Sequence, residues 1–306
     1  MNYELIIIGG GPAGITAGIY AARNRLKTLL ITKDFGGQMA RKAVPIENYP
    51  GFKEISGIEL IKRFKEHLDK FKVEIEEDSV IKIEKSNGNF KVLTENKKEF
   101  KSQTVIIASG SDPRPLKVQG EQEFIGRGLS YCATCDSPLF KNKTVAVIGG
   151  GNSGFEAATA LSKWAKKIYI LEYGEKLVAD IENQELAQKT GKVEIITGAA
   201  LKEIHGDEFV NSIIYQDRKI SKNKELKVEG VFVEIGLQPA SAFANSLVGF
   251  NEKGEIKVDF ETFQTKIPGL FAAGDVNMGK YKQIITAAGE GAKAALAAYE
   301  YLKQLK

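Results

Sequence analysis

Two glycine-rich turns constrain the fold of this chain more than any other feature of its sequence. Each follows an apolar run and matches the pattern G-x-G-x-x-G, at residues 9–14 and again at residues 149–154. A segment with helical periodicity and a second apolar strand follow each turn, which is the context that dinucleotide binding requires. The first glycine allows the tight turn, the second lets a pyrophosphate approach the backbone, and the third lets helix and strand pack closely. The sequence therefore predicts two dinucleotide sites, one to deliver a hydride and one to receive it.

The rest of the chain repeats one plan after each turn. The expected helices cover residues 14–24 and 153–166, and the second strands cover residues 28–32 and 167–172. Later strands are expected at 80–85, 90–94 and 104–108, then at 201–205, 209–216 and 230–235, with a turn at 87–89. Prolines at 113, 115 and 239 follow these sets and suit crossovers between domains. We therefore expect an α/β fold of two Rossmann-like dinucleotide-binding domains, each with three layers (ββα).

The composition is that of a globular protein and excludes several functional classes. A chain of 306 residues is long enough for two domains. Its net charge of +4 comes with lysines spread along the whole sequence, so no nucleic-acid partner is expected. No apolar run approaches the roughly 18 residues that span a bilayer, and the first residues lack the basic start of a signal peptide. We expect a cytoplasmic protein with no membrane partner.

The chain has two cysteines, Cys132 and Cys135, and they are separated by two residues. A structural zinc site needs four ligands, and the two histidines, His67 and His205, lie far from this pair in the sequence. No metal is therefore expected. The spacing leaves two interpretations, a redox-active pair or two inert buried thiols, and it favours the redox pair.

Taken in order, these and several further motifs make the chain resemble the low-molecular-weight thioredoxin reductases over essentially its whole length. The further motifs lie at residues 36–38, 47–51, 108–110, 132–136, 272–275 and 282–284. Residues 137–141, 149–158 and 281–293 also resemble the reductase portion of the alkyl hydroperoxide reductase flavoprotein. That protein carries an extra N-terminal redox domain, whereas this chain begins at the first glycine turn. We therefore expect it to pass electrons to a separate partner.

The resemblance implies an FAD domain assembled from residues 1–114 and 247–306, with a nicotinamide domain at 115–246 inserted between them. It implies a strand at 269–275 that ends at the flavin, and a helix at 283–305 whose N-terminus points at the isoalloxazine. Thr32 stands where an acidic ribose ligand is usual, but this family also has a non-acidic residue there. The residues that match FAD-binding positions are Gly9, Gly11, Pro12, Ala13, Gly14, Thr32, Gly37, Gln38, Asn48, Val80, Ala108, Gly110, Gly274, Asp275, Lys282, Gln283 and Ile284.

The second glycine turn is expected to bind the nicotinamide donor, and Glu172 indicates which one. NADPH-dependent members of the family carry His-Arg-Arg-x-x-x-Arg here, whose cations bind the 2′-phosphate, and this chain has lost them. A carboxylate can accept hydrogen bonds from two ribose hydroxyls but repels a phosphate, so NADH is expected over NADPH. The alternative is that Lys176 restores NADPH binding. The expected donor-binding residues are Gly149, Gly151, Asn152, Ser153, Gly154, Glu172, Tyr173, Ile235 and Gly236.

The resemblance also assigns roles to the cysteine pair. Cys135 would face the flavin from near the start of a short helix, a placement that favours the thiolate. Cys132 would attack the partner's disulfide, and Asp136 would be the general acid/base for the leaving thiolate, or alternatively a helix N-terminal cap. The family further implies a homodimer and a rotation of the inserted domain, hinged near residues 114–117 and 242–245.

The expected activity is that of an FAD-dependent thioredoxin-disulfide reductase. Its carrier is either a thioredoxin or a glutaredoxin-like or peroxiredoxin-linked protein. Ferredoxin-driven relatives have a degraded nicotinamide site, so the intact second turn argues against that interpretation. The intact pair of cysteines followed by Asp136 argues against a non-enzymatic protein that senses dinucleotides or stores flavin.

Overall fold

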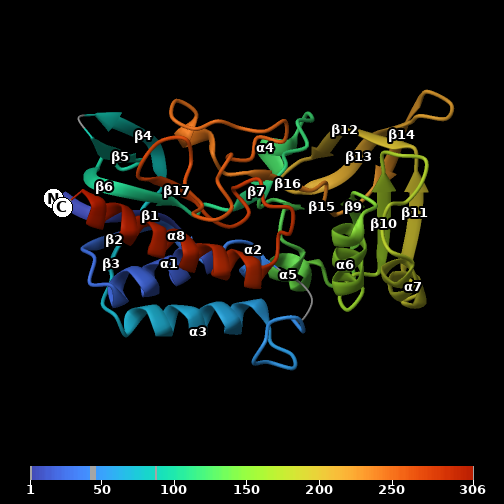
Figure 1. Cartoon of the computed structure of the whole chain (residues 1–306). Helices are drawn as coiled ribbons and strands as arrows, with labels where there is room; N and C mark the ends of the chain where they lie inside the picture. The colour runs from blue at the N-terminus through green and yellow to red at the C-terminus, as the bar shows by residue number, and fades with distance from the viewer. Residues whose placement is uncertain (1, 42–45, 87, 306) are drawn as a thin grey trace. The chain divides into compact units, whose positions relative to one another are not determined.

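The computed structural model describes residues 2–41, 46–86 and 88–305 (Figure 1). Its chain divides into two compact units. The first contains residues 2–40, 46–112 and 238–305, and the second is built on residues 113–237. Each unit contains one of the two glycine turns, and the second unit is inserted into the sequence of the first.

The second crossing between the units lies nine residues before the expected position at 246/247. Residues 238–246 belong to the first unit because Ala244 is buried in its core and the Ala240 N–H donates to the Gly110 carbonyl over 3.0 Å. The expected hinge at 242–245 is therefore occupied by a short 3₁₀ helix of the first unit, η2 (Ala242–Ala244). At the two crossings themselves, β7 (Ser111–Pro113) and β16 (Leu237–Pro239) pair as a two-stranded sheet.

The first unit is built on a sheet whose strands follow the order β3-β2-β1-β6-β5-β4, with β17 also paired to β6. The central strand β1 buries the run from Leu5 to Ile8 almost completely, as expected for a parallel strand covered on both faces. Pairing is parallel from β3 to β6 and to β17, and antiparallel through β5 and β4. The strands are β1 (Asn2–Gly10), β2 (Thr28–Phe35), β3 (Glu74–Glu77), β4 (Val80–Ser86), β5 (Asn89–Thr94), β6 (Glu99–Ile107) and β17 (Leu270–Ala272).

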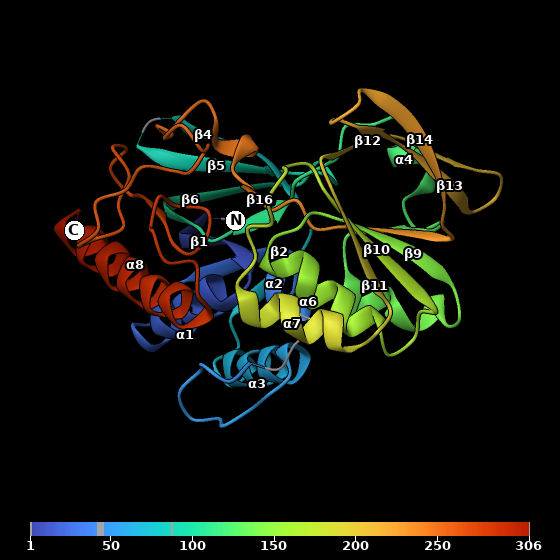
Figure 2. The same cartoon turned by 90° about the vertical axis from the view of Figure 1, so that its right-hand side faces the viewer.

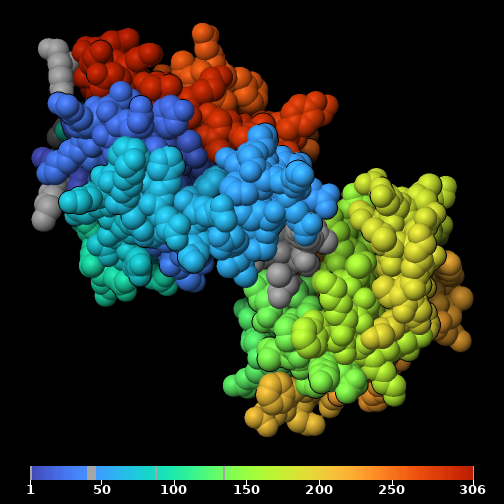
Figure 3. Space-filling model, turned by 90° about the horizontal axis from the view of Figure 1, so that it is seen from below, coloured from blue at the N-terminus to red at the C-terminus, as the bar shows by residue number. Residues whose placement is uncertain are grey.

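Three long helices pack together in this unit, with α1 between α8 and α3 (Figure 1). Helix α8 approaches α1 closely because Gly291 faces it, and a Cβ added at Gly291 would lie 2.1 Å from the Ala13 carbonyl oxygen. Figure 3 views this side of the unit, with the cyan residues of α3 at the surface. The helices are α1 (Pro12–Arg23), α2 (Gln38–Arg41), α3 (Gly57–Asp69) and α8 (Ile284–Gln304).

The second unit has a parallel sheet with the strand order β11-β10-β9-β15-β8. Side chains of β9 alternate between two cores, with Val145 and Val147 in one and Ala146 and Ile148 in the other. The first core lies under α6 and α7, which run side by side (Figure 2), and the second lies under an antiparallel sheet of β12, β13 and β14. This unit therefore has the expected three ββα layers.

The second unit's strands and helices follow in chain order. The parallel strands are β8 (Leu129–Ser130), β9 (Thr144–Ile148), β10 (Lys167–Glu172), β11 (Val193–Thr197) and β15 (Gly230–Val233). The antiparallel strands are β12 (Ala199–Gly206), β13 (Val210–Asp217) and β14 (Lys222–Lys227). The helices are α4 (Glu121–Phe124), α5 (Ala133–Asp136), η1 (Ser137–Phe140), α6 (Asn152–Leu161) and α7 (Ile181–Lys189).

Most expected elements appear within a few residues, and three differ by more. The strand expected at 104–108 begins five residues earlier, at Glu99, as β6. The helix expected at 153–166 ends at Leu161, where the Lys163 and Trp164 N–H groups donate to the carbonyls three residues before them, at Ala160 and Leu161, over 3.4 and 2.9 Å. The strand expected at 269–275 is reduced to β17, since Gly274 turns the chain with a φ of +81°. The expected turn at 87–89 includes residue 87, which lies outside the described residues. None of the helices in the described segments has the length and apolarity needed to cross a membrane.

Candidate active site

The first glycine turn is closed where the elements pack and open where a ligand would approach. Gly9 has a φ of +117°, and a Cβ there would lie 2.3 Å from the Ala108 carbonyl oxygen. A Cβ at Gly14 would lie 1.8 Å from the Gly9 oxygen, so α1 packs against the turn as the pattern requires. No described atom lies within 4 Å of a Cβ added at Gly11. The space left there, with Pro12 at the first position of α1, suits a pyrophosphate at a helix N-terminus.

Other expected FAD residues gather around the same end of this unit. The Asn48 side-chain amide donates to the Gln283 Oε1 over 3.2 Å, although the two residues are 235 positions apart. Gln283 caps α8, where its side chain and that of Thr286 form a capping box. Ile284 begins the helix and is half-buried against the core. These contacts fix the position of the N-terminus of α8.

The loops that carry the remaining candidates differ in how open they are. Gly37 and Gly110 have positive φ angles of +49° and +68°, and the described residues leave the position of an added Cβ free at both. The Gln38 amide donates to the Ser111 carbonyl over 2.7 Å.

Thr32 is buried and its hydroxyl donates to the Asp34 carbonyl over 2.5 Å. Val80 is half-buried at the start of β4. The Thr32 side chain is thus engaged by its own loop.

A polar cluster that sequence analysis missed supports the turn after β17. The Glu290 carboxylate accepts hydrogen bonds from the Gly274 N–H and from the fully buried Asn277 amide, both over 2.7 Å. Burial raises the pKa of the Glu290 carboxyl. Lys282 donates to the Asp275 carbonyl over 3.2 Å and pairs with Glu255 over 2.9 Å. The cluster fixes the backbone of the segment that carries Asp275 and Lys282.

The second glycine turn repeats the geometry of the first. Gly149 has a φ of +120°, and a Cβ there would lie 2.2 Å from the Glu234 carbonyl oxygen. A Cβ at Gly154 would lie 1.9 Å from the Gly149 oxygen, whereas at Gly151 the nearest described atom would be 3.8 Å away. Gly236 also lies in open space, with a φ of +95°. The turn is therefore closely packed at Gly149 and Gly154, and it leaves room for a ligand at Gly151 and Gly236.

The polar residues that flank this turn are held in place. The Asn152 side chain donates to the Asp180 carboxylate over 2.8 Å and accepts from the Asp180 N–H over 2.7 Å. Ser153 is exposed on the first turn of α6. Ile235 is half-buried after β15 and packs against the core beneath the antiparallel sheet. Loops after three of the parallel strands therefore contribute to the neighbourhood of the glycine turn.

Glu172 ends β10, and its carboxylate is fixed by two backbone N–H groups. One oxygen accepts from Gly150 over 2.7 Å, and the other accepts from Gly174 over 2.6 Å. Each oxygen retains a second lone pair that can accept from a ligand hydroxyl. The arrangement therefore holds an acidic acceptor beside the glycine turn, where the ribose of a bound dinucleotide lies in this fold.

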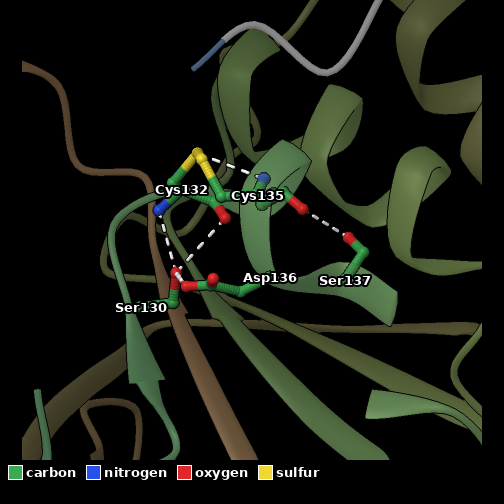
Figure 4. The surroundings of a disulfide bond; sticks show 6 residues. Ser130, Cys132, Cys135, Asp136 and Ser137 are labelled. Atoms are coloured by element: carbon green, nitrogen blue, oxygen red, sulfur yellow. Dashed lines mark hydrogen bonds between the residues drawn. A yellow bond between two sulfur atoms is a disulfide. The ribbon is translucent and has the colours of Figure 1, made fainter. Parts of the chain in front are cut away.

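Cys132 and Cys135 form a disulfide in the second unit, with an S–S distance of 2.08 Å (Figure 4). Cys135 lies near the start of the short helix α5, as expected, and Cys132 lies directly before that helix. Cys132 is the N-cap of α5, and its sulfur accepts from the Cys135 N–H over 3.2 Å. Cys135 is exposed and Cys132 is half-buried. The helix begins at Ala133, so both cysteines lie at its N-terminal end.

The Asp136 carboxylate points toward Ser130 (Figure 4), a residue that sequence analysis did not single out. The Ser130 hydroxyl donates to the Asp136 Oδ2 over 2.6 Å and accepts from the Cys132 N–H over 2.9 Å. Within the described residues, the Asp136 side chain makes no capping bond to η1, which follows it. The geometry thus ties this carboxylate to the backbone of Cys132 and gives no support to the helix-cap alternative.

A buried carboxylate holds the residue before the first cysteine. Glu121 is 3% exposed and accepts from the Leu116 and Lys117 N–H groups over 3.0 and 2.6 Å, and from the Tyr131 hydroxyl. Burial, followed by the hydrogen bond to Glu121, raises the pKa of the Tyr131 phenol above its usual range. The contact joins α4 to the strand that leads into the redox pair.

Removing the Tyr131 hydroxyl should measurably destabilise the protein. Tyr131→Phe leaves the buried Glu121 with one donor fewer, so we expect the free energy of unfolding to fall by about 1–2 kcal/mol. Urea unfolding measures the change, with Tyr20→Phe at an exposed tyrosine as the matched control. Equal stability of the two variants would show that the hydroxyl contributes nothing.

Comparisons with known proteins agree with this geometry. A family model described as pyridine nucleotide-disulphide oxidoreductase matches residues 3–291. The crystal structure of Lactococcus lactis thioredoxin reductase is similar, with a TM-score of 0.90, 39% sequence identity and 99% of both chains covered. The thioredoxin reductase of T. acidophilum has a TM-score of 0.87 and 38% identity, with 100% of this chain and 99% of that chain covered.

Curated relatives are longer than this chain. A Staphylococcus epidermidis protein named as an alkyl hydroperoxide reductase subunit is 40% identical over 301 residues, which are 98% of this chain and 59% of that protein. A Bacillus subtilis protein named NADH dehydrogenase is 40% identical over 300 residues, 98% of this chain and 58% of that protein. The chain thus spans about three fifths of the length of these relatives. It belongs to the pyridine nucleotide-disulphide oxidoreductase family, as a disulfide oxidoreductase similar to the low-molecular-weight thioredoxin reductases.

Proposed function

We propose that this enzyme transfers electrons from NADH, through FAD and the Cys132–Cys135 pair, to the disulfide of a thioredoxin-type protein. The observation that carries the proposal is the disulfide itself, formed three residues apart and followed directly by Asp136. It lies in the unit that also contains the second glycine turn. The balanced reaction oxidises NADH to NAD⁺ while one proton is taken up and the carrier disulfide becomes two thiols.

FAD is assigned to the first unit. The open positions at Gly11, Gly37 and Gly110 leave room for a ligand, and the N-termini of α1 and α8 favour its negative charge. FAD bound there would accept a hydride from the nicotinamide and return the electron pair to a disulfide. The chain's own contribution is to hold Asn48, Gln283 and the segment with Asp275 in fixed positions.

NADH is assigned to the second glycine turn because Glu172 is anchored there as an acceptor. Its carboxylate can receive the ribose hydroxyls of NADH, whereas the 2′-phosphate of NADPH would bring negative charge against it. Lys176, the residue that could restore NADPH binding, is exposed on the following loop. The name NADH dehydrogenase, given to a relative with 40% identity, agrees with this assignment.

The two cysteines have different roles in the proposal. After reduction of the disulfide, Cys132 attacks a carrier sulfur, forming a mixed disulfide and expelling a carrier thiolate. The Cys135 N–H, which reaches the Cys132 sulfur, stabilises negative charge on it. Asp136 supplies the proton to the expelled thiolate, held in position by Ser130. Cys135 then attacks the Cys132 sulfur, which re-forms the enzyme disulfide, breaks the mixed disulfide and releases the second carrier thiolate.

A second candidate carrier is a glutaredoxin-like or peroxiredoxin-linked protein. The similarity to an alkyl hydroperoxide reductase protein over 98% of the chain favours it. Steady-state turnover with a thioredoxin and with a glutaredoxin-like protein, each at varied concentration, separates the two. The carrier with the higher kcat/KM is the better candidate, and turnover of neither would overturn the proposed acceptor.

The choice of donor has its own test at Glu172. We expect the native enzyme to use NADH with a kcat/KM at least about tenfold above that for NADPH, because one unfavourable charge contact is worth about 1.4 kcal/mol. Glu172→Gln should reduce this ratio about tenfold, and the matched variant Glu175→Gln, in the following loop, should preserve it. A native enzyme that uses NADPH equally well contradicts the assignment.

A further inference from the structure

Arg218 and Tyr173 form a stacked pair next to the end of β10. The guanidinium carbon lies 4.1 Å from the centre of the tyrosine ring, and Nη1 donates to the Tyr173 carbonyl over 2.8 Å. Both side chains are at the surface, and Tyr173 is 62% exposed. A planar cation stacked on an aromatic ring thus faces solvent in a protein that otherwise buries most of its large apolar side chains.

Backbone hydrogen bonds fix the loops that carry this pair. The Gly198 N–H donates to the Gly174 carbonyl, and the Arg218 N–H donates to the Gly198 carbonyl, each over 2.8 Å. The Arg218 side chain then completes a closed circuit by bonding to Tyr173. Three loops, after β10, between β11 and β12, and after β13, are therefore locked together. A surface prepared in this way loses little conformational entropy when it binds a ligand.

The position of the pair identifies the ligand that it suits. Glu172 directly precedes Tyr173 and, in the proposed function, accepts the hydroxyls of the donor's adenosine ribose. The adenine is joined to that ribose by a single glycosidic bond, so it must lie next to Glu172. Aromatic rings and guanidinium planes are the side chains on which bases stack.

We propose that Tyr173 and Arg218 form the docking platform for the adenine ring of the dinucleotide donor. The inference rests on the proposed function, because it requires the donor at the second glycine turn. Arg218 lies directly after β13 of the antiparallel sheet and not on the parallel strands, so a loop of the antiparallel sheet contributes directly to donor affinity. The platform contacts the adenine and does not contact the nicotinamide end of the donor.

The experiment compares NADH with reduced nicotinamide mononucleotide, which carries the same hydride but no adenosine. We expect Arg218→Ala and Tyr173→Ala each to raise the KM for NADH about tenfold with kcat nearly constant, which corresponds to the loss of one stacking contact. The loss in kcat/KM with the mononucleotide should be about tenfold smaller, because that donor has no base to stack. Lys222→Ala removes a charge from the exposed edge of the same hairpin and is the matched control for both donors.

Three results would overturn the platform. Equal losses with NADH and with the mononucleotide mean that the variants disturb the fold or the reacting end. A loss confined to NADPH means that Arg218 is a phosphate ligand instead. An unchanged KM for NADH means that adenine does not contact the pair. Failure of the proposed donor site is distinguishable from these, because Glu172→Gln would then also leave the ratio of NADH to NADPH efficiency unaltered.

Discussion

Cys132→Ser is expected to lower turnover of a protein disulfide by about 10³-fold or more, as the loss of a covalent nucleophile does in other enzymes. A serine oxygen cannot form a disulfide with Cys135, so the enzyme loses the place where the electron pair is held before transfer. Reduction of the flavin by NADH does not need the sulfur and should persist. Anaerobic stopped-flow measurement of flavin bleaching, beside steady-state turnover, separates the two half-reactions.

The matched variant Cys135→Ser tests which sulfur attacks the carrier. It should also abolish turnover, but its free Cys132 should form a lasting mixed disulfide with the carrier, because the resolving thiol is missing. Non-reducing electrophoresis and mass spectrometry detect that adduct. If the adduct forms instead through Cys135 in the Cys132→Ser protein, the two roles are reversed. Full turnover by either variant would remove the disulfide from the reaction.

The glycine turns and the strands around them could be predicted because local sequence fixes them. Each turn needs glycine where φ is positive or where an added Cβ would meet a carbonyl, as at Gly9 and Gly14, and that requirement is visible in the sequence. The strand at 167–172 has its expected limits because its apolar run is also a local feature of the sequence. Continuous apolar residues with short polar borders describe a buried parallel strand well.

The supporting residues could not be predicted because their partners are remote or lack a distinctive pattern. Glu290 meets the Gly274 N–H across a turn of the chain, and Arg218 reaches Tyr173 from 45 positions away. No sequence pattern distinguishes Ser130 from other polar residues, and only the folded structure shows its hydrogen bond to Asp136. The position of Cys135 near the start of a short helix, in contrast, was predicted from the sequence and is confirmed.

Gly14→Ala and Gly11→Ala should both weaken flavin binding, but for different physical reasons. The added methyl at Gly14 would lie 1.8 Å from the Gly9 oxygen, so the turn must open and the free energy of unfolding should fall by about 3 kcal/mol or more. The methyl at Gly11 meets no described atom, and its φ of −82° is ordinary for alanine. Its stability without cofactor should therefore stay within about 0.5 kcal/mol of the parent.

Flavin content at 450 nm and unfolding of the flavin-free proteins together distinguish these effects. The Gly11→Ala protein should fold like the flavin-free parent yet bind FAD at least about tenfold more weakly, because its methyl occupies the space left for the pyrophosphate. A Gly11→Ala protein that retains FAD normally would show that the open position is not used by the cofactor. Gly151 and Gly154 repeat in the second glycine turn the geometry of Gly11 and Gly14 in the first. Gly151→Ala should therefore raise the KM for NADH while leaving bound flavin in place.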